Sequence, residues 1–149
     1  VNGIGSVEQP KLRKQIFEKF KSQGFSFMTI VHPSAFVSPT AEIEEGAQVM
    51  ALACVQTRAK VGANSIINTR SSVDHDCQIG KHCHIAPGVT LSGNCQIEDL
   101  CHLGVGSTVI QNVRLGKKSM LAASACLTKS YPDGSRLFGI PATPKKRAT

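Results

Sequence analysis

The residues best suited to acid–base chemistry are a histidine between two aspartates, Asp74-His75-Asp76. A carboxylate beside an imidazole can fix its tautomer and raise its basicity, which is what a general base requires. The same pattern also fits a solvated polar corner, so spacing alone leaves both interpretations open. Ser71 and Ser72 lie close by, but no elbow-like sequence surrounds them, and a serine nucleophile is therefore not indicated.

The element that must position these residues is a six-residue repeat over residues 31–127. An aliphatic residue recurs there at every sixth position, seventeen times without an insertion. A second register, four positions after each of the first sixteen, holds nothing larger than valine. Neither the helical period of about 3.6 residues nor the strand period of two explains this pattern. The aliphatic positions are Val31, Val37, Ile43, Val49, Val55, Val61, Ile67, Val73, Ile79, Ile85, Leu91, Ile97, Leu103, Val109, Leu115, Leu121 and Leu127.

The repeat predicts an all-β fold, the left-handed parallel β-helix of hexapeptide repeats. Each hexad would supply a short strand and a tight corner, and three hexads would complete one triangular coil. The aliphatic side chains would point inward, and the small residues would lie where two walls converge. Seventeen hexads therefore predict between five and six coils.

Three segments are predicted. Residues 1–30 read as a strand, a helix and a strand, either half of an α/β nucleotide-binding unit or simply a cap. Ser6 and Gln9 form a capping-box pattern before Pro10, and Gly24 is a plausible helix stop. Residues 31–130 form the β-helix, and residues 131–149 form a C-terminal loop and basic tail. A cap is expected because the first coil would otherwise expose unpaired strand edges and the core. The apolar helix face would consist of Leu12, Ile16, Phe17 and Phe20.

Residues eighteen positions apart should stack on successive coils. His84 would then face His102, and two imidazoles about 4.8 Å apart disfavour double protonation. His75 would stack on Gly93, whose missing side chain leaves a backbone N–H and open space beside the imidazole. His75 and His84 lie half a coil apart and so face different sides of one chain. If both serve one site, that site is more easily built between chains, and a three-fold assembly is the natural packing of triangular prisms.

Composition narrows the class of protein. No apolar run approaches 18 residues and no signal-peptide pattern is present, so the chain reads as soluble and not secreted. The six cysteines contain no CxxC pair and mostly occupy the small-residue register, which predicts reduced, buried thiols and a cytoplasmic setting. The net charge of +7 is concentrated near both ends, but aromatic platforms for nucleic acid are missing.

A combination of short motifs carries a resemblance to a known family. The motifs are Ile4-Gly5, His32-Pro33-Ser34-Ala35, Val73-Asp74-His75-Asp76-Cys77, His84-Ile85-Ala86-Pro87-Gly88, Leu91-Ser92-Gly93 and Gly139-Ile140-Pro141-Ala142. With them, the chain resembles the hexapeptide-repeat sugar acetyltransferases, the family of sialic acid O-acetyltransferases and nucleotide-linked amino-sugar N-acetyltransferases. The resemblance covers nearly the whole chain.

The resemblance implies an acetyl-CoA-dependent enzyme that transfers an acetyl group directly to an amino or hydroxyl group of a sugar or nucleotide sugar. It implies a homotrimer with active sites between subunits, His75 as general base, and Asp76 as the neighbour that raises its basicity. At Ala123 the relatives often have glycine. The positions implied to contact acetyl-CoA are His84, the Gly93 amide (donor to the thioester carbonyl), Val105 and Ala123.

Relatives of full length carry a complete α/β domain before the β-helix, where the acceptor's nucleotide binds. Here residues 1–30 resemble only its incomplete end, without the glycine-rich first turn, so either the chain is truncated or it uses a different acceptor. Two other functions fit the scaffold. A zinc carbonic anhydrase would place an H-x4-H pair on one chain, and the five histidines offer no such spacing, so no metal site is predicted. A non-catalytic assembly module is the other; thermal stabilisation by acetyl-CoA would count against it.

Overall fold

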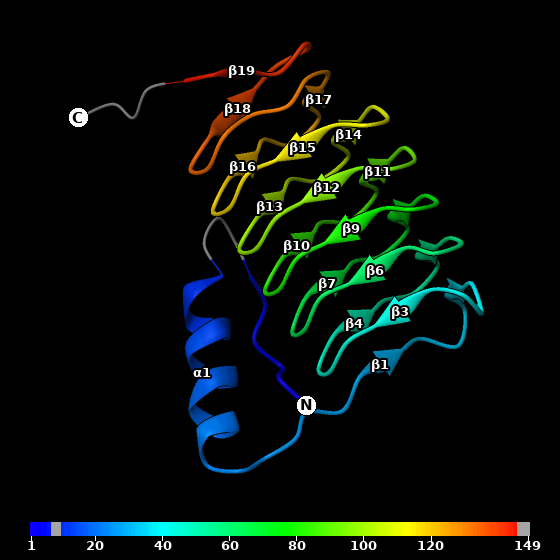
Figure 1. Cartoon of the computed structure of the whole chain (residues 1–149), viewed down its shortest axis with the longest axis vertical. Helices are drawn as coiled ribbons and strands as arrows, with labels where there is room; N and C mark the ends of the chain where they lie inside the picture. Colours follow the sequence, from blue (N-terminus) through cyan, green and yellow to red (C-terminus); the bar gives the residue numbers. More distant parts are fainter. Residues whose placement is uncertain (7–9, 146–149) are drawn as a thin grey trace.

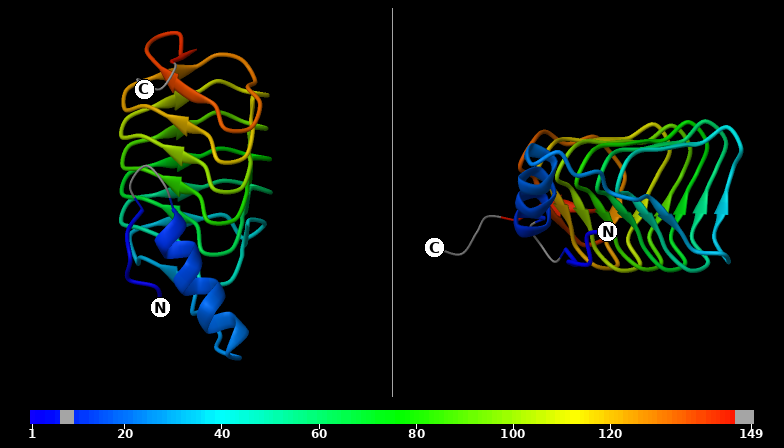
Figure 2. Two further views of the ribbon diagram at one scale, coloured as in Figure 1. Left: turned by 90° about the vertical axis from the view of Figure 1, so that its left-hand side faces the viewer. Right: turned by 90° about the horizontal axis from the view of Figure 1, so that it is seen from below.

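A computed structural model describes residues 1–6 and 10–145 of the chain. One helix lies beside a three-walled parallel β-helix, whose coils stack along the long axis of the molecule (Figure 1). Two further views show the walls enclosing a common interior (Figure 2). The predicted hexapeptide-repeat fold is confirmed. Within the described residues, no helix is long and apolar enough to cross a membrane.

Each wall is a sheet built from very short strands of successive coils. The eight-stranded sheet contains β1 (Ile30–Val31), β4 (Gln48–Val49), β7 (Ile66–Ile67), β10 (His84–Ile85), β13 (His102–Leu103), β16 (Met120–Leu121), β18 (Arg136–Phe138) and β19 (Thr143–Pro144). The six-stranded sheet contains β2 (Phe36–Val37), β5 (Cys54–Val55), β8 (Ser72–Val73), β11 (Thr90–Leu91), β14 (Thr108–Val109) and β17 (Cys126–Leu127). The five-stranded sheet contains β3 (Glu42–Ile43), β6 (Lys60–Val61), β9 (Gln78–Ile79), β12 (Gln96–Ile97) and β15 (Arg114–Leu115).

The coils stack in register, so the same corner recurs on every level. Val73 of β8 pairs with Leu91 of β11, eighteen residues on, and the other wall strands up to β17 follow the same spacing. From Gly46 to Ser124 the second residue of each corner adopts a left-handed conformation, for example Asp76 with φ 61° and Asn94 with φ 57°. Because the backbone repeats, side chains at equivalent corner positions form columns along each edge.

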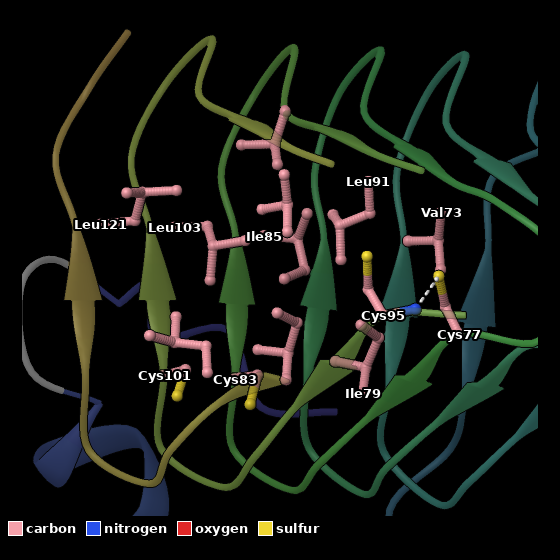
Figure 3. Packing of buried hydrophobic residues seen from close by; sticks show 14 of the residues in the cluster. Val73, Cys77, Ile79, Cys83, Ile85, Leu91, Cys95, Cys101, Leu103 and Leu121 are labelled. Atoms are coloured by element: carbon pink, nitrogen blue, oxygen red, sulfur yellow. Dashed lines mark hydrogen bonds between the residues drawn. The ribbon is translucent and has the colours of Figure 1, made fainter. Parts of the chain in front are cut away.

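The aliphatic register forms the core. From Val49 to Leu127 every predicted inward residue is at most 3 % exposed. Figure 3 shows Val73, Ile85, Leu91 and other members packed side by side, with cysteines in the corners between them. The first coil differs, since Val31 is 45 % exposed where no earlier coil covers it. All six cysteines are free thiols, and four of them are buried.

The N-terminal segment departs from the prediction in several places. Residues 1–5 form no strand, and of residues 25–31 only β1 is a strand. Helix α1 (Lys11–Ser22) begins after Pro10, without a side-chain cap, and ends before Gly24, whose φ is 86°. The predicted capping-box partner Gln9 lies outside the described residues. The helix packs along the edge between the five- and eight-stranded sheets, beside the coils instead of across the open first coil (Figure 2).

The buried face of α1 was predicted only in part: Phe17 is buried as expected, but the second buried residue is Arg13. Arg13 is 2 % exposed, whereas Leu12 is 57 % exposed. The Arg13 guanidinium donates to the carbonyl oxygens of Asn64 (3.0 Å), Asn2 (2.8 Å) and Ile4 (2.7 Å). Burial lowers its pKa to about 10. Hydrogen bonds to backbone carbonyls thus replace the apolar contacts that a helical periodicity suggests.

The C-terminal segment was predicted as a loop, but it continues the β-helix. Strand β18 pairs with β16, and Leu137 stacks fully buried opposite Leu121. Tyr131 bridges to Leu115, and its hydroxyl donates to the carbonyl oxygen of Ala142 at 2.9 Å. Both pairings span sixteen residues instead of eighteen, which hides them from a six-residue period. Lys146 and Arg147 of the predicted basic tail lie outside the described residues.

Candidate active site

His75 lies at a corner between the six- and five-stranded sheets, two residues after the end of β8. We call this column of corners the His75 edge. Each coil contributes two residues to it, and on four successive coils these are residues 57–58, 75–76, 93–94 and 111–112. The His75 side chain is 58 % exposed. Its backbone N–H donates to Oδ1 of Asp74 at 2.7 Å, which fixes the turn that carries the imidazole.

Asp76 holds one side of the His75 ring. The His75 Nδ1 lies 2.8 Å from Asp76 Oδ2. An ionised carboxylate can only accept, so Nδ1 carries the proton and donates it to Asp76. This tautomer leaves the Nε2 lone pair available to a substrate proton. The structure thus brings the two predicted catalytic residues into contact, while their catalytic roles stay predictions.

Gly93 lies against the other side of the ring, as the eighteen-residue stacking predicts. A Cβ atom added at Gly93 would fall 2.5 Å from both Cε1 and Nε2 of His75. The space left by the missing side chain is therefore filled by the imidazole itself, which corrects the expectation of open space there. Within the described residues, no backbone or side-chain oxygen accepts the Gly93 N–H.

Arg58 completes the cluster, and sequence reasoning missed it. Its Nε donates to Asp76 Oδ1 at 2.7 Å and its Nη2 donates to Oδ2 at 2.9 Å. Arg58 precedes Asp76 by one full coil, so the stacking rule could have found it. The guanidinium, and to a smaller extent His75, lower the pKa of Asp76 to about 2.

The low pKa of Asp76 gives a pH prediction. Because its pKa in the folded chain lies below the ordinary value of 3.8, its ion pairs stabilise the fold above about pH 4 and fade as the pH falls toward about 2. We therefore expect Asp76 to stay ionised throughout the pH range of activity. Carboxyl-carbon NMR of Asp76 should show a midpoint near pH 2, and a midpoint near 4 would contradict the observed arrangement.

His84 is buried on the eight-stranded sheet, away from His75. Its Nδ1–H donates to the carbonyl oxygen of Ser6, and its Nε2 accepts from the Asn68 amide at 3.0 Å. The ring packs edge-on against His102, with centroids 5.0 Å apart, as the stacking predicts. Burial lowers the pKa of His84, which favours the neutral imidazole. The predicted contact of His84 with acetyl-CoA stays a prediction.

Val105 and Ala123 lie on a different edge, between the eight- and six-stranded sheets. We call this the Val105 edge; its positions include residues 69–70, 87–88, 105–106 and 123–124. Both residues are exposed, Val105 by 55 %. A hollow of about 360 Å³ on this edge is lined by Thr69, Arg70, Pro87 and Gly88. Apart from His84 on the eight-stranded sheet, the predicted site residues therefore form two groups that do not meet within one chain.

Other candidate sites are less convincing. A larger hollow of about 430 Å³ lies over the five-stranded sheet, where Gly62 and Gly80 lack side chains, and neither His75 nor Val105 borders it. Its charged rim is largely paired internally, as in the contact of Lys117 with Asp99. In the part of the chain that the structure describes, no three His, Cys, Asp or Glu residues are grouped to hold a metal ion.

A family model and several known proteins match this chain. The family model for bacterial transferase hexapeptide (six repeats) matches residues 58–93, which include both Arg58 and His75. The GDP-perosamine N-acetyltransferase of Escherichia coli O157:H7 is 31 % identical over 88 residues, which cover 59 % of this chain and 40 % of that protein. The UDP-3-O-acylglucosamine N-acyltransferase of Methylorubrum extorquens is 33 % identical over 84 residues, or 24 % of its length.

Solved structures extend the match over almost the whole chain. PerB from Caulobacter crescentus, in complex with CoA and GDP-perosamine, is 35 % identical with a TM-score of 0.90, covering 94 % of this chain and 68 % of that one. The acetyltransferase domain of PglB from Neisseria gonorrhoeae FA1090, in complex with acetyl coenzyme A, is 37 % identical with a TM-score of 0.89, covering 93 % and 68 %. The chain belongs to the hexapeptide-repeat family of nucleotide-sugar acetyltransferases. It spans less than half the length of the curated relatives it matches.

Proposed function

We propose that this chain transfers an acetyl group from acetyl-CoA to the amino group of a nucleotide-linked sugar, with His75 as the general base. The observation that carries the proposal is the His75 imidazole held between Asp76 and Gly93. Relatives whose names specify N-acetyl transfer to a nucleotide sugar support the choice of an amine acceptor over a hydroxyl.

The arrangement suits direct acyl transfer. His75 Nε2 accepts a proton from the sugar amine as the amine attacks the thioester carbonyl, and Asp76 stabilises the imidazolium that forms. The imidazolium then returns the proton to the departing thiolate. The Gly93 N–H, which has no acceptor in the described part of the chain, is available to the oxyanion of the tetrahedral intermediate.

We propose that the site is completed by a neighbouring copy in a homotrimer. The His75 edge and the Val105 edge are the two borders of the six-stranded sheet. If three copies turn this sheet toward a common axis, the His75 edge of each copy meets the Val105 edge of the next. Acetyl-CoA held along Val105 and Ala123 of one copy would then reach His75 of its neighbour.

The composition of the walls supports this orientation. Outward residues of the five-stranded sheet are charged or amide-bearing, namely Glu42, Lys60, Gln78, Gln96 and Arg114. The equivalent residues of the six-stranded sheet carry no charge and include Phe36, which is 53 % exposed. An uncharged wall is easier to bury against another copy. These residues are Phe36, Cys54, Ser72, Thr90, Thr108 and Cys126.

For His84 we propose a supporting role at the Val105 edge. Its ring holds the Asn68 amide, whose Oδ1 accepts the backbone N–H of Thr69 at 2.7 Å. Thr69 borders the hollow together with Pro87. The two residues lie two coils and one coil before Val105 on the same edge. His84 thereby fixes the backbone of the edge along which acetyl-CoA is proposed to lie. We also propose a reducing, cytoplasmic setting, since all six thiols are free.

The test is a turnover assay with acetyl-CoA and GDP-perosamine or a UDP-linked amino sugar, in which release of the CoA thiol is followed by a thiol reagent. We expect CoA release that depends on the amino sugar, thermal stabilisation of the protein by acetyl-CoA, and a trimer by analytical ultracentrifugation. A monomer with full activity would contradict the shared site. Stabilisation by neither acetyl-CoA nor nucleotide sugar would instead favour a non-catalytic assembly module.

A further inference from the structure

Arg58 occupies the same corner position as Asp76, one coil earlier on the His75 edge. Both residues adopt left-handed backbone conformations, with φ of 57° and 61°. The Arg58 backbone N–H is itself held by the Thr40 hydroxyl at 3.2 Å, again one coil earlier. The two side chains therefore leave matching points on stacked coils, and the guanidinium meets the carboxylate with two parallel hydrogen bonds.

The fork of Arg58 leaves the carboxylate little freedom. Both oxygens of Asp76 are engaged, and Oδ2 serves Arg58 Nη2 and His75 Nδ1 together. A planar guanidinium that binds both oxygens also fixes the plane of the carboxylate. The direction in which Oδ2 receives the His75 proton is thus set by Arg58, since Asp76 alone could turn about its side-chain bonds.

The charges around His75 are few. Its own turn contributes Asp74 and Asp76, and the preceding coil contributes Arg58. The following coil contributes Gly93 and Asn94, which carry no charge. Arg58 is the cation that faces this group from the described residues.

We propose that Arg58 is a positioning residue that acts through Asp76 to keep the His75 proton on Nδ1 and Nε2 unprotonated for catalysis. The kinetic consequence rests on the proposed function, but the effect on the tautomer does not. Arg58 touches neither reacting group, so its loss should lower kcat and leave the binding of acetyl-CoA largely unchanged.

The experiment compares the unmodified chain with Arg58→Gln and Arg58→Lys. Nitrogen NMR shifts of the His75 ring report which nitrogen carries the proton, independently of any activity. We expect proton occupancy on Nδ1 in the unmodified protein and a mixture of tautomers in Arg58→Gln. In the assay, kcat should fall about tenfold, with the KM for acetyl-CoA changed less than about twofold. Arg58→Lys keeps the positive charge but cannot bind both carboxylate oxygens in parallel. Its tautomer ratio and kcat should therefore lie between those of the unmodified protein and those of Arg58→Gln.

Arg114→Gln is the matched control. Arg114 makes a comparable exposed ion pair with Glu98, its Nε lying 2.8 Å from Oε1, but on the five-stranded sheet. The Arg114→Gln variant loses the same charge as Arg58→Gln, but it should keep the wild-type tautomer of His75 and the wild-type kcat. A wild-type His75 tautomer in Arg58→Gln, or a kcat equal to that of Arg114→Gln, would overturn the proposal. If the unmodified protein transfers no acetyl group, the proposed function fails, and the NMR comparison still decides the role of Arg58.

Discussion

Replacing His75 with alanine is expected to lower kcat by about 10²–10⁴-fold, the usual contribution of a positioned general base, while the fold remains intact. The side chain is 58 % exposed and contributes nothing to the core, so its removal opens no cavity. Its polar partner Asp76 keeps the Arg58 fork. The measurements are steady-state CoA release and a thermal melt on the same preparation.

Lys81→Ala provides the control for His75→Ala. Lys81 is the exposed first residue of the next corner along the chain, six residues on, but it faces the edge that carries α1. Truncation there should change neither kcat nor the melting temperature. If His75→Ala retained wild-type turnover, His75 would not be the base, although the β-helix and the family assignment would stand.

Replacing Gly93 with alanine is expected to lower kcat by about 10²-fold through displacement of the His75 ring. The new Cβ would fall 2.5 Å from Cε1 and Nε2 of His75. The His75 ring can relieve this close contact only by moving away. The backbone of Gly93 is not in the left-handed region, so alanine fits its conformation. An exposed imidazole moves easily, and the melting temperature should therefore change little.

A double-mutant cycle separates this mechanism from general damage. If Gly93→Ala acts through His75, adding it to His75→Ala should lower kcat no further. Gly3→Ala is the matched control, because a Cβ there meets nothing within 4 Å. Additive losses in the double variant would show that Gly93 acts independently of the ring, for example through its N–H alone.

Much of this site could be predicted from the sequence, because residues eighteen positions apart stack on successive coils. The six-residue period predicts the coil, and adding eighteen to His75 gives Gly93, which the structure places against the ring. The same rule pairs His84 with His102. Subtracting eighteen from Asp76 gives Arg58, so the residue missed from the sequence was available to the same reasoning applied in the other direction.

Contacts outside the repeat could not be predicted in this way. Ser6 reaches His84 across seventy-eight residues, and Arg13 reaches Asn64 across fifty-one. Neither pairing has a periodic signal, because the N-terminal segment crosses the wall without sharing its register. The C-terminal turn fails for a different reason, since Leu121 and Leu137 stack with two residues fewer than a full coil.

The uniform coil length also limits how such a chain can change in evolution. Arg58, Asp76 and Gly93 come from three successive levels and keep their alignment only while each level has the same number of residues. Loss or gain of one residue between them would misalign the column unless a corner absorbed the change, as happens in the sixteen-residue level that ends at Leu137. Duplication or deletion of a whole level away from them would leave the column untouched. We therefore expect such chains to change length most readily by whole coils, because this keeps the alignment of the remaining coils.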